Sequence, residues 1–169
     1  MNSRSAQFLI DNYWRYHYCG ECSGTSDYIG EQPEKVGDLL EAIGLDRELQ
    51  WAYSVYKVSC CNSLKEMDQH AQLYMTAQVA KDAYTRTTTN SGFEDAFTFE
   101  YGGNAYTAWG NMGHDGIYIV EGSLKQVNGK WTLETCYYYT GEDVADPAYK
   151  FTFNNDAGYY RIDSVTPLF

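Results

Sequence analysis

Five cysteines are the residues whose type and spacing could do chemistry in this chain of 169 residues. Two residues separate Cys19 from Cys22, a spacing that suits thiol exchange or zinc binding. A redox motif of this kind should follow a strand in a βαβ unit, whereas this one follows a helix-like segment. Zinc would need a second pair of ligands, and the adjacent Cys60 and Cys61 chelate one ion awkwardly. We therefore predict no metal and no cofactor. A disulfide from the first pair to the second is expected in an oxidising compartment.

No other group of residues carries a catalytic signature. The chain lacks a nucleophile elbow, a zinc-protease helix motif, a phosphate-binding loop and a dinucleotide fingerprint. A cysteine–histidine pair would combine Cys22 or Cys136 with His17 or His114, but neither cysteine has the flanking residues of an activated nucleophile. Cys136 is instead expected to be a small buried residue of a strand. The acidic stretch 140–147 is predicted to be a solvated loop, because its spacing is not that of a calcium site. We therefore favour a protein that is not an enzyme.

A single change of hydrophobic period shows which elements would hold these residues. Helices are predicted at residues 4–18 and 38–43, the second ending at Gly44. Ser63, with Glu66 three residues later, opens the main helical region as a capping box. Thr76 is expected to cap a second helix there. The length predicts one domain over residues 1–169, with a helical and loop region containing the CxxC motif at 1–62, main helices at 63–89 and an antiparallel sheet at 93–169.

The sheet is predicted from apolar residues that alternate with polar ones. Residues 52–58 are either a strand or an extended connector. Further strands are predicted at 96–101, 105–110, 117–126, 130–139, 149–153 and 159–165. Gly102-Gly103 and Asn128-Gly129 are typical hairpin turns. The side chains expected to face the helices are Phe97, Phe99, Tyr101, Trp131, Leu133, Phe151, Phe153, Tyr160 and Ile162. The pattern predicts an α+β fold in which N-terminal helices pack on a bent antiparallel meander of five to six strands.

Aromatic residues give the one candidate ligand site. The chain has seventeen tyrosines, many of them in the predicted strands. A curved sheet backed by helices often forms a concave groove, which five aromatic residues could line: Tyr106, Trp109, Tyr118, Tyr138 and Tyr139. The alternative, which we favour, is that these side chains form core packing and a solvent-facing tyrosine ladder.

The charge of the chain limits the partners that it can bind. Twelve basic and twenty-three acidic residues give a formal net charge of −11. This field repels nucleic acids and anionic membrane surfaces, so neither is predicted as a partner. A basic protein partner, a cationic ligand or a divalent metal fits the sign better, although we favour the interpretation that acidity serves solubility alone. No run of about 18 apolar residues is present, so no membrane span is predicted.

The first residues, Met1–Gln7, lack the charged and apolar regions of a signal peptide. The chain is therefore either cytoplasmic or an exported domain whose leader was replaced by the initial methionine. We expect the exported form, outside the cytoplasm. Counting thiols would separate the two, because five free thiols favour the cytoplasm and two disulfides favour export.

Two families resemble parts of this chain. Helices followed by a bent meander resemble the NTF2-like cone fold, which includes enzymes and many non-catalytic ligand-binding or accessory domains. The stretch from Tyr56 to Met67, with Tyr74-Met75-Thr76 after it, is similar to a motif of the IseA-type family. Residues 159–165 are similar to that family's closing strand. These are cell-wall proteins of Gram-positive bacteria that inhibit peptidoglycan endopeptidases, and the likeness would cover roughly residues 52–165.

Together these observations predict a non-enzymatic, extracytoplasmic binding or inhibitory domain that acts on a protein or cell-wall partner through an acidic, tyrosine-rich surface. One alternative is an NTF2-like small-molecule binder or enzyme that uses the concave face of the sheet. Another is a cytoplasmic acidic decoy or immunity-type protein that occludes a basic partner. The sequence does not indicate an oligomeric state.

Overall fold

The computed structural model of the chain forms two compact units. It describes residues 1–19, 26–28, 33–44, 53–59, 61–83, 96–110, 117–140 and 143–169, some of them by their backbone alone. The first unit comprises residues 1–14, 72–82 and 114–169, and the second comprises residues 15–71 and 83–113. The expected single domain over residues 1–169 stays a prediction.

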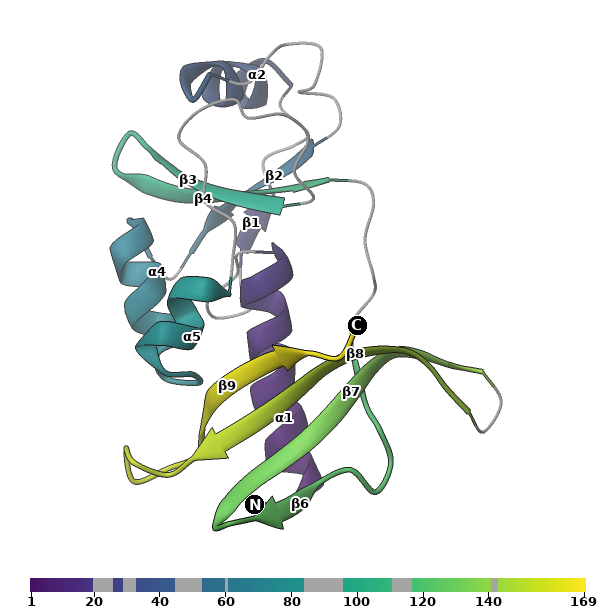
Figure 1. Cartoon of the computed structure of the whole chain (residues 1–169). Coiled ribbons are helices and arrows are strands. Elements are labelled where there is room, and N and C mark those ends of the chain that lie inside the picture. Colours follow the sequence, from purple (N-terminus) through teal and green to yellow (C-terminus); the bar gives the residue numbers. More distant parts are fainter. Residues whose placement is uncertain are drawn as a thin grey trace. The chain divides into compact units, whose positions relative to one another are not determined.

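The first unit contains a five-stranded antiparallel sheet (Figure 1). Its strands are β5 (Tyr118–Ile119), β6 (Lys125–Val127), β7 (Lys130–Thr140), β8 (Asp143–Asn154) and β9 (Arg161–Pro167). Strands β7, β8 and β9 are consecutive neighbours, while β5 and β6 both pair with β7. Asn128 and Gly129 have φ values of 51° and 79°, as the predicted two-residue turn between β6 and β7 requires.

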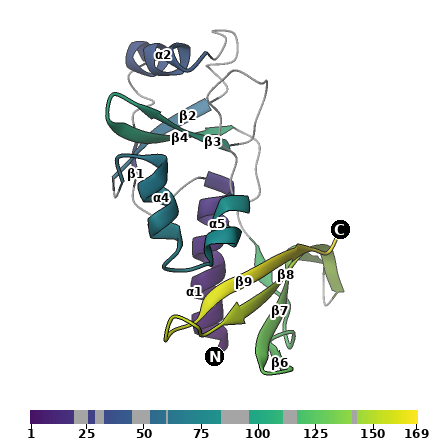
Figure 2. The ribbon, with the colours of Figure 1, turned by 60° about the vertical axis from the view of Figure 1, so that its left-hand side comes forward.

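Helix α1 (Ser3–Trp14) covers one face of this sheet (Figures 1 and 2). Asn2 caps the helix, because its Oδ1 accepts a hydrogen bond of 2.9 Å from the Ser5 N–H. The ring of Tyr13 packs edge-on against Phe151, with 5.2 Å between ring centroids. The sheet contributes Leu133, Phe151, Phe153 and Ile162, all buried as predicted. These residues share a face because side chains alternate along each strand.

The outer edge of β9 is covered by the residues that lead into helix α5 (Ala77–Asp82). The Ile162 N–H donates to the Tyr74 carbonyl at 2.8 Å, and the Thr76 N–H donates to the Ile162 carbonyl at 2.9 Å. Thr76 also caps α5, as expected, since its hydroxyl accepts from the Val79 N–H at 3.4 Å. This segment satisfies backbone groups that an exposed edge strand would leave open.

Two strand predictions in this unit need correction. The expected strand 117–126 is broken into β5 and β6, because Gly122 turns the chain with φ +75° and the Ser123 hydroxyl bonds the backbone of Glu134. The expected solvated loop 140–147 is instead mostly strand, since β8 begins at Asp143 and pairs with Thr140. The polar composition of that stretch is typical of a loop, but its residues extend β7 and β8 because their backbones pair with each other.

The second unit contains a four-stranded antiparallel sheet in the order β1-β2-β4-β3. Its elements are the π-helical turn η1 (Arg15–Cys19), β1 (Ser26–Tyr28), α2 (Pro33–Ala42), β2 (Tyr53–Val58), α4 (Leu64–Ala71), β3 (Ala96–Tyr101) and β4 (Asn104–Gly110). The predicted hairpin at Gly102-Gly103 joins β3 to β4, with φ values of 58° and 78°. Residues 53–58 are a strand, and this strand pairs with β4.

Both faces of this sheet are covered in the second unit. On one face Phe99 stacks on Tyr106, with centroids 5.3 Å apart, in a core with Leu39 and Leu40 of α2. Four consecutive residues of β4, Ala105–Ala108, are buried, so its other face is enclosed as well. The Oγ1 of Thr98 has no hydrogen-bond partner among the described residues, although it is buried.

Two predicted helix boundaries of the second unit are confirmed, the capping box before α4 and the end at Gly44, whereas α2 begins at Pro33 and not at residue 38. The Ser63 hydroxyl accepts from the Glu66 N–H at 3.1 Å, and the Glu66 carboxylate accepts from the Asn62 N–H at 2.6 Å. Gly44, with φ +86°, ends the helical region after α2. The α+β class is therefore confirmed. The strands form two sheets and not the single meander expected, because β2 pairs with β4.

Candidate functional site

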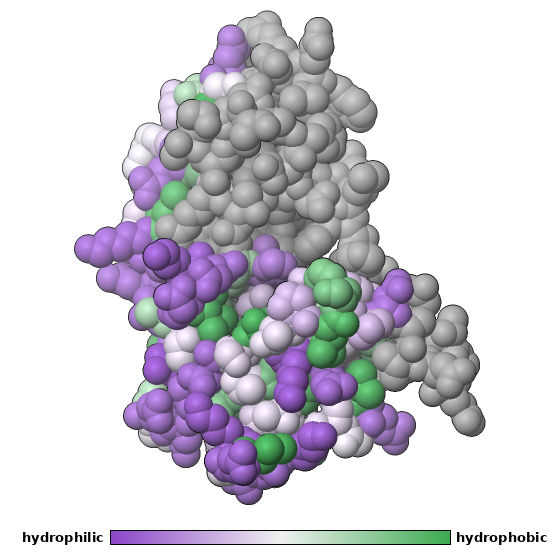
Figure 3. All heavy atoms as spheres, viewed as in Figure 1, coloured by the Kyte–Doolittle hydropathy of each residue, from purple (hydrophilic) through white to green (hydrophobic). Residues whose placement is uncertain are grey.

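The candidate site is the face of the five-stranded sheet opposite to α1, which we call the polar face. Most of its residues alternate with those that face α1, and all except the buried Thr132 are exposed or half-buried; they are Lys125, Lys130, Thr132, Glu134, Lys150, Thr152, Asn154, Arg161, Asp163, Ser164 and Thr166. No helix or strand that the structure describes in this unit covers them. Figure 3 looks onto this face and shows hydrophilic and intermediate residues over most of its coloured part, with smaller hydrophobic patches among them.

Polar side chains follow one another across the strands in register. One row runs from Lys125 on β6 through Thr132 and Thr152 to Ser164 on β9. The hydroxyls of Thr152 and Ser164 are 2.6 Å apart and share a hydrogen bond. In a second row Glu134 lies opposite Lys150. The face is thus lined by hydroxyl groups and charges.

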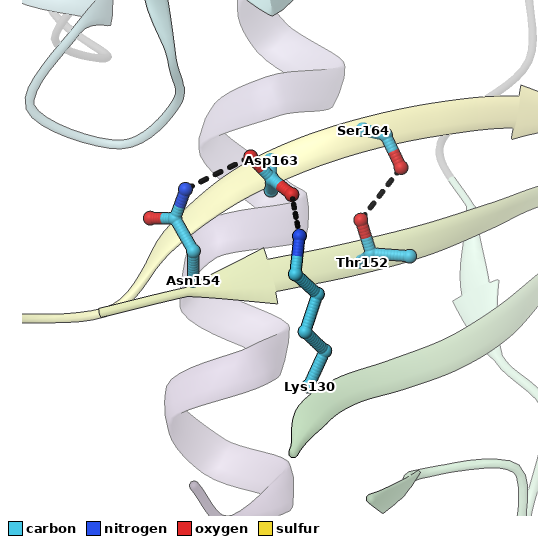
Figure 4. A network of polar contacts seen from close by, with 5 residues as sticks. All are labelled: Lys130, Thr152, Asn154, Asp163 and Ser164. Atoms are coloured by element: carbon cyan, nitrogen blue, oxygen red, sulfur yellow. Dashed lines mark hydrogen bonds and ion pairs between the residues drawn. The ribbon is translucent and has the colours of Figure 1, made fainter. Parts of the chain in front are cut away.

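A β-bulge places two neighbouring residues of β9 on this face. The register shifts by one residue, since Thr152 pairs with Ser164 while Phe153 pairs with Ile162. Asp163 is the additional residue, so that Asp163 and Ser164 both lie on the polar side (Figure 4). Without the bulge, Asp163 would be directed towards the buried side of the sheet.

Asp163 is the centre of a hydrogen-bonded network (Figure 4). Its carboxylate accepts from the Lys130 ammonium at 2.9 Å and from the Asn154 amide at 2.8 Å. The hydrogen bond from Lys130 lowers the pKa of Asp163, although partial burial opposes the shift. The same hydrogen bond raises the pKa of Lys130. Both groups are therefore charged at neutral pH. The protonated lysine cannot act as a general base, and the ionised aspartate cannot act as a general acid.

Arg161 and Asn154 form the least satisfied part of the network. The Arg161 guanidinium donates from Nη1 to the Gln72 carbonyl at 3.2 Å. The Arg161 Nε and the Asn154 Oδ1 are buried without hydrogen-bond partners among the described residues. The two residues are register partners on β9 and β8. Their arrangement holds charge and polar groups in place, and the face can bind through ion pairs and hydrogen bonds.

An aromatic cluster lies on the other side of the same sheet, where α1 packs. It consists of Tyr13, Trp14, Tyr137, Tyr149, Phe151 and Phe169. The Tyr137 hydroxyl donates to the Tyr149 hydroxyl at 3.4 Å. Burial raises the pKa values of Tyr13 and Tyr137, and the neighbouring tyrosines add to both shifts. These phenols stay neutral at physiological pH, and the cluster fixes the helix to the sheet.

The five aromatic residues predicted as a ligand site belong to two different sheets. Tyr106 is buried in the core of the second unit, and Trp109 is on the same strand. Tyr118 is exposed on β5 of the first unit. Tyr138 and Tyr139 are on β7, but their side chains lie outside the described part of the chain. A shared groove for these residues stays a prediction.

The predicted disulfide also stays a prediction. Cys22 and Cys60 lie outside the described residues, as does the side chain of Cys19. Cys61 is buried, and Cys136 is buried in β7 as expected. In the ranges that the structure describes, no three histidine, cysteine or acidic side chains are placed to hold a metal ion.

Sequence reasoning missed the polar face. The alternate positions Lys130, Thr132 and Glu134 were a usable signal, since they lie between the predicted inward residues. The bulge at Asp163 had no such signal. No helix of the described residues is long and apolar enough to cross a membrane. No family model, curated protein or solved structure matches this chain.

Proposed function

We propose that this chain is a non-enzymatic binding domain whose polar face docks on the surface of a protein partner. The observation that carries the proposal is the asymmetry of the five-stranded sheet. Helix α1 packs on one face, while the opposite face presents the Lys130–Asp163–Asn154 network and the Thr152–Ser164 pair. Their hydrogen bonds hold these side chains in position before binding, which lowers the entropy lost when a partner docks.

The composition of the face supports a protein partner. Interfaces of non-obligate complexes combine polar groups with hydrogen bonds at a density of about one per 100–200 Å². One large apolar side chain, that of Val127 at the end of β6, is exposed beside these residues. The face therefore suits a reversible contact with a polar surface, and it lacks the apolar character of an obligate interface.

Export from the cytoplasm and the NTF2-like arrangement are further parts of this proposal. The packing of a helix on one face of an antiparallel sheet supports the NTF2-like arrangement. Thiol titration tests export, if the protein is isolated without a reductant and then unfolded in denaturant. Fewer than five reactive thiols would support export, and five would count against it.

The docking face is tested with Thr152→Trp, which places a bulky, uncharged side chain at its centre. Cross-linked complexes from an extract of the source organism would be compared between the wild type, this variant and Gln69→Trp. Gln69 is exposed on α4, so the control adds the same side chain elsewhere. We expect one partner to be retained by the wild type and by Gln69→Trp, and lost with Thr152→Trp. Equal retention by both variants would refute the proposed face.

A further inference from the structure

The polar face has the opposite charge to the chain as a whole. It carries four basic residues, Lys125, Lys130, Lys150 and Arg161, and two acidic residues, Glu134 and Asp163. The rest of the chain holds the remaining eight basic and twenty-one acidic residues. A net charge of −11 therefore describes the average surface and not this face.

Both acidic residues of the face lie next to basic residues of the same face. Asp163 accepts from Lys130 at 2.9 Å, and Glu134 is the register partner of Lys150. The register partner of Lys125 is Thr132, a neutral residue. Neither Lys125 nor Lys150 forms an ion pair within 4 Å with a described residue, and both are exposed. Their ammonium groups are thus available to a partner.

Two of the three lysines are close enough to act together. The lysines lie on β6, β7 and β8, which are adjacent strands of one sheet. Neighbouring strands are about 4.8 Å apart and each residue adds about 3.4 Å along a strand, so the register places Lys125 about 8 Å from Lys130, about 12 Å from Lys150, and leaves about 14 Å between Lys130 and Lys150. The first separation is comparable to the Debye length of about 8 Å at physiological ionic strength. Lys125 therefore adds its potential to that of Lys130, which Asp163 partly neutralises, while Lys150 contributes a second contact point on the same face.

The side chains of the face and the charge of the chain disfavour a nucleic acid as the acidic partner. Arg161 is the only arginine of the face, and its guanidinium is already engaged with the Gln72 carbonyl while its Nε is buried. With Nη1 engaged and Nε buried, it is poorly placed for the two-pronged contact that arginine makes to the phosphates of a nucleic acid backbone. The residues that make up the polar face include no aromatic side chain on which a base could stack. The chain's overall charge further opposes a nucleic acid.

We infer that the polar face binds an acidic segment of a protein partner, through Lys125, Lys130 and Lys150 and the hydroxyl groups beside them. The inference rests on the proposed function, because it names the chemistry of the partner that this face would take. It also reverses the expectation of a basic partner that the net charge gave. Ion pairs at the rim of such a contact act mainly on the association rate, so binding should weaken as salt is added.

The test uses poly-L-glutamate as the probe and the full chain as the protein, with affinity measured by isothermal titration calorimetry. The variant Lys125→Gln/Lys150→Gln removes two ammonium groups and leaves the Lys130–Asp163 pair intact. The control Lys65→Gln/Lys81→Gln removes two exposed lysines from helices α4 and α5. We expect the face variant to bind about tenfold more weakly than the wild type and the control to bind as the wild type does.

Three results would overturn the inference: no binding of poly-L-glutamate by the wild type at low salt, equal weakening by the two double variants, or tighter binding of polyphosphate of matched charge. Thermal unfolding of each variant shows whether it is folded. The proposed function is judged separately by the cross-linking comparison of Thr152→Trp with Gln69→Trp. Loss of the natural partner in Thr152→Trp, combined with no binding of poly-L-glutamate, would retain the docking face and reject its acidic partner.

Discussion

The two sheets of this protein differ in what their second face does. In the four-stranded sheet, consecutive residues Ala105–Ala108 of β4 are all buried. In the five-stranded sheet, β8 alternates between the buried Phe151 and Phe153 and the half-buried Thr152 and Asn154. A sheet covered on both faces selects small or apolar residues at every position, whereas an open face can carry charges. The difference shows where in the molecule polar residues are available for binding.

The largest effect is expected when an arginine is placed in the enclosed sheet. Thr107 is fully buried, and a guanidinium there would lose its hydration without a charged partner. We expect Thr107→Arg to cost more than about 4 kcal/mol and to leave no cooperative unfolding transition. Circular dichroism during urea titration measures this. A folded variant with near-native stability would show that the second face of β4 is open.

A smaller but still large effect is expected from truncating the covered face of the five-stranded sheet. Phe151 is fully buried and packs against Tyr13 and Phe153. Phe151→Ala should reduce the free energy of unfolding by about 3–5 kcal/mol, because it leaves a cavity beneath α1. Urea unfolding of this variant checks the value. A loss below about 1 kcal/mol would contradict the packing of α1 on this sheet.

The same substitution, threonine to valine, should change the free energy of unfolding in opposite directions in the two sheets. Thr98→Val removes a buried hydroxyl that lacks a partner among the described residues, so a gain of about 1 kcal/mol is expected. Thr152→Val removes the hydroxyl that bonds Ser164 at 2.6 Å and should cost about 1 kcal/mol. Both values come from urea unfolding. Two losses of equal size would mean that the Thr98 hydroxyl has a partner after all.

The smallest effect concerns the charge of Asp163. Its lowered pKa means that the carboxylate stabilises the folded chain above the ordinary aspartate pKa, and that this contribution is lost as the pH falls through the lowered value. The raised pKa of Lys130 acts in the other direction, so its contribution persists below the ordinary lysine pKa and is lost at higher pH.

Asp163→Asn should therefore destabilise the protein at pH 7 and have less effect near pH 2, because the contribution of the wild-type carboxylate is lost as the pH falls through its lowered pKa. Chemical unfolding at both pH values measures the difference. Lys65→Gln serves as a control, since this exposed lysine of α4 belongs to the other unit. An effect of Asp163→Asn that is equal at the two pH values would show that the Asp163 charge does not stabilise the fold.

The features that could be read from the sequence are local. The Asn128-Gly129 turn and the Ser63–Glu66 cap are encoded by neighbouring residues, so they were predicted correctly. The inward residues Leu133 and Phe151 were also found, because alternation along a strand needs no knowledge of its partner.

The features that escaped prediction depend on residues far apart in the chain. The division into two sheets depends on β2 pairing with β4, which lies about fifty residues further along the sequence. The place of Asp163 on the polar face depends on a shift of register against β8. The positive sign of the face was hidden by the net charge of −11, which is an average over the whole chain.

The most direct test of the central claim is the free energy of unfolding of Thr152→Arg. If the polar face is open in the free protein, the arginine side chain extends into solvent from the middle of the sheet. The free energy of unfolding should then fall by only about 1 kcal/mol, which is the loss expected from removing the hydrogen bond to Ser164. A loss as large as that of Phe151→Ala would mean that another part of the chain covers this face, and the face could not be the docking surface.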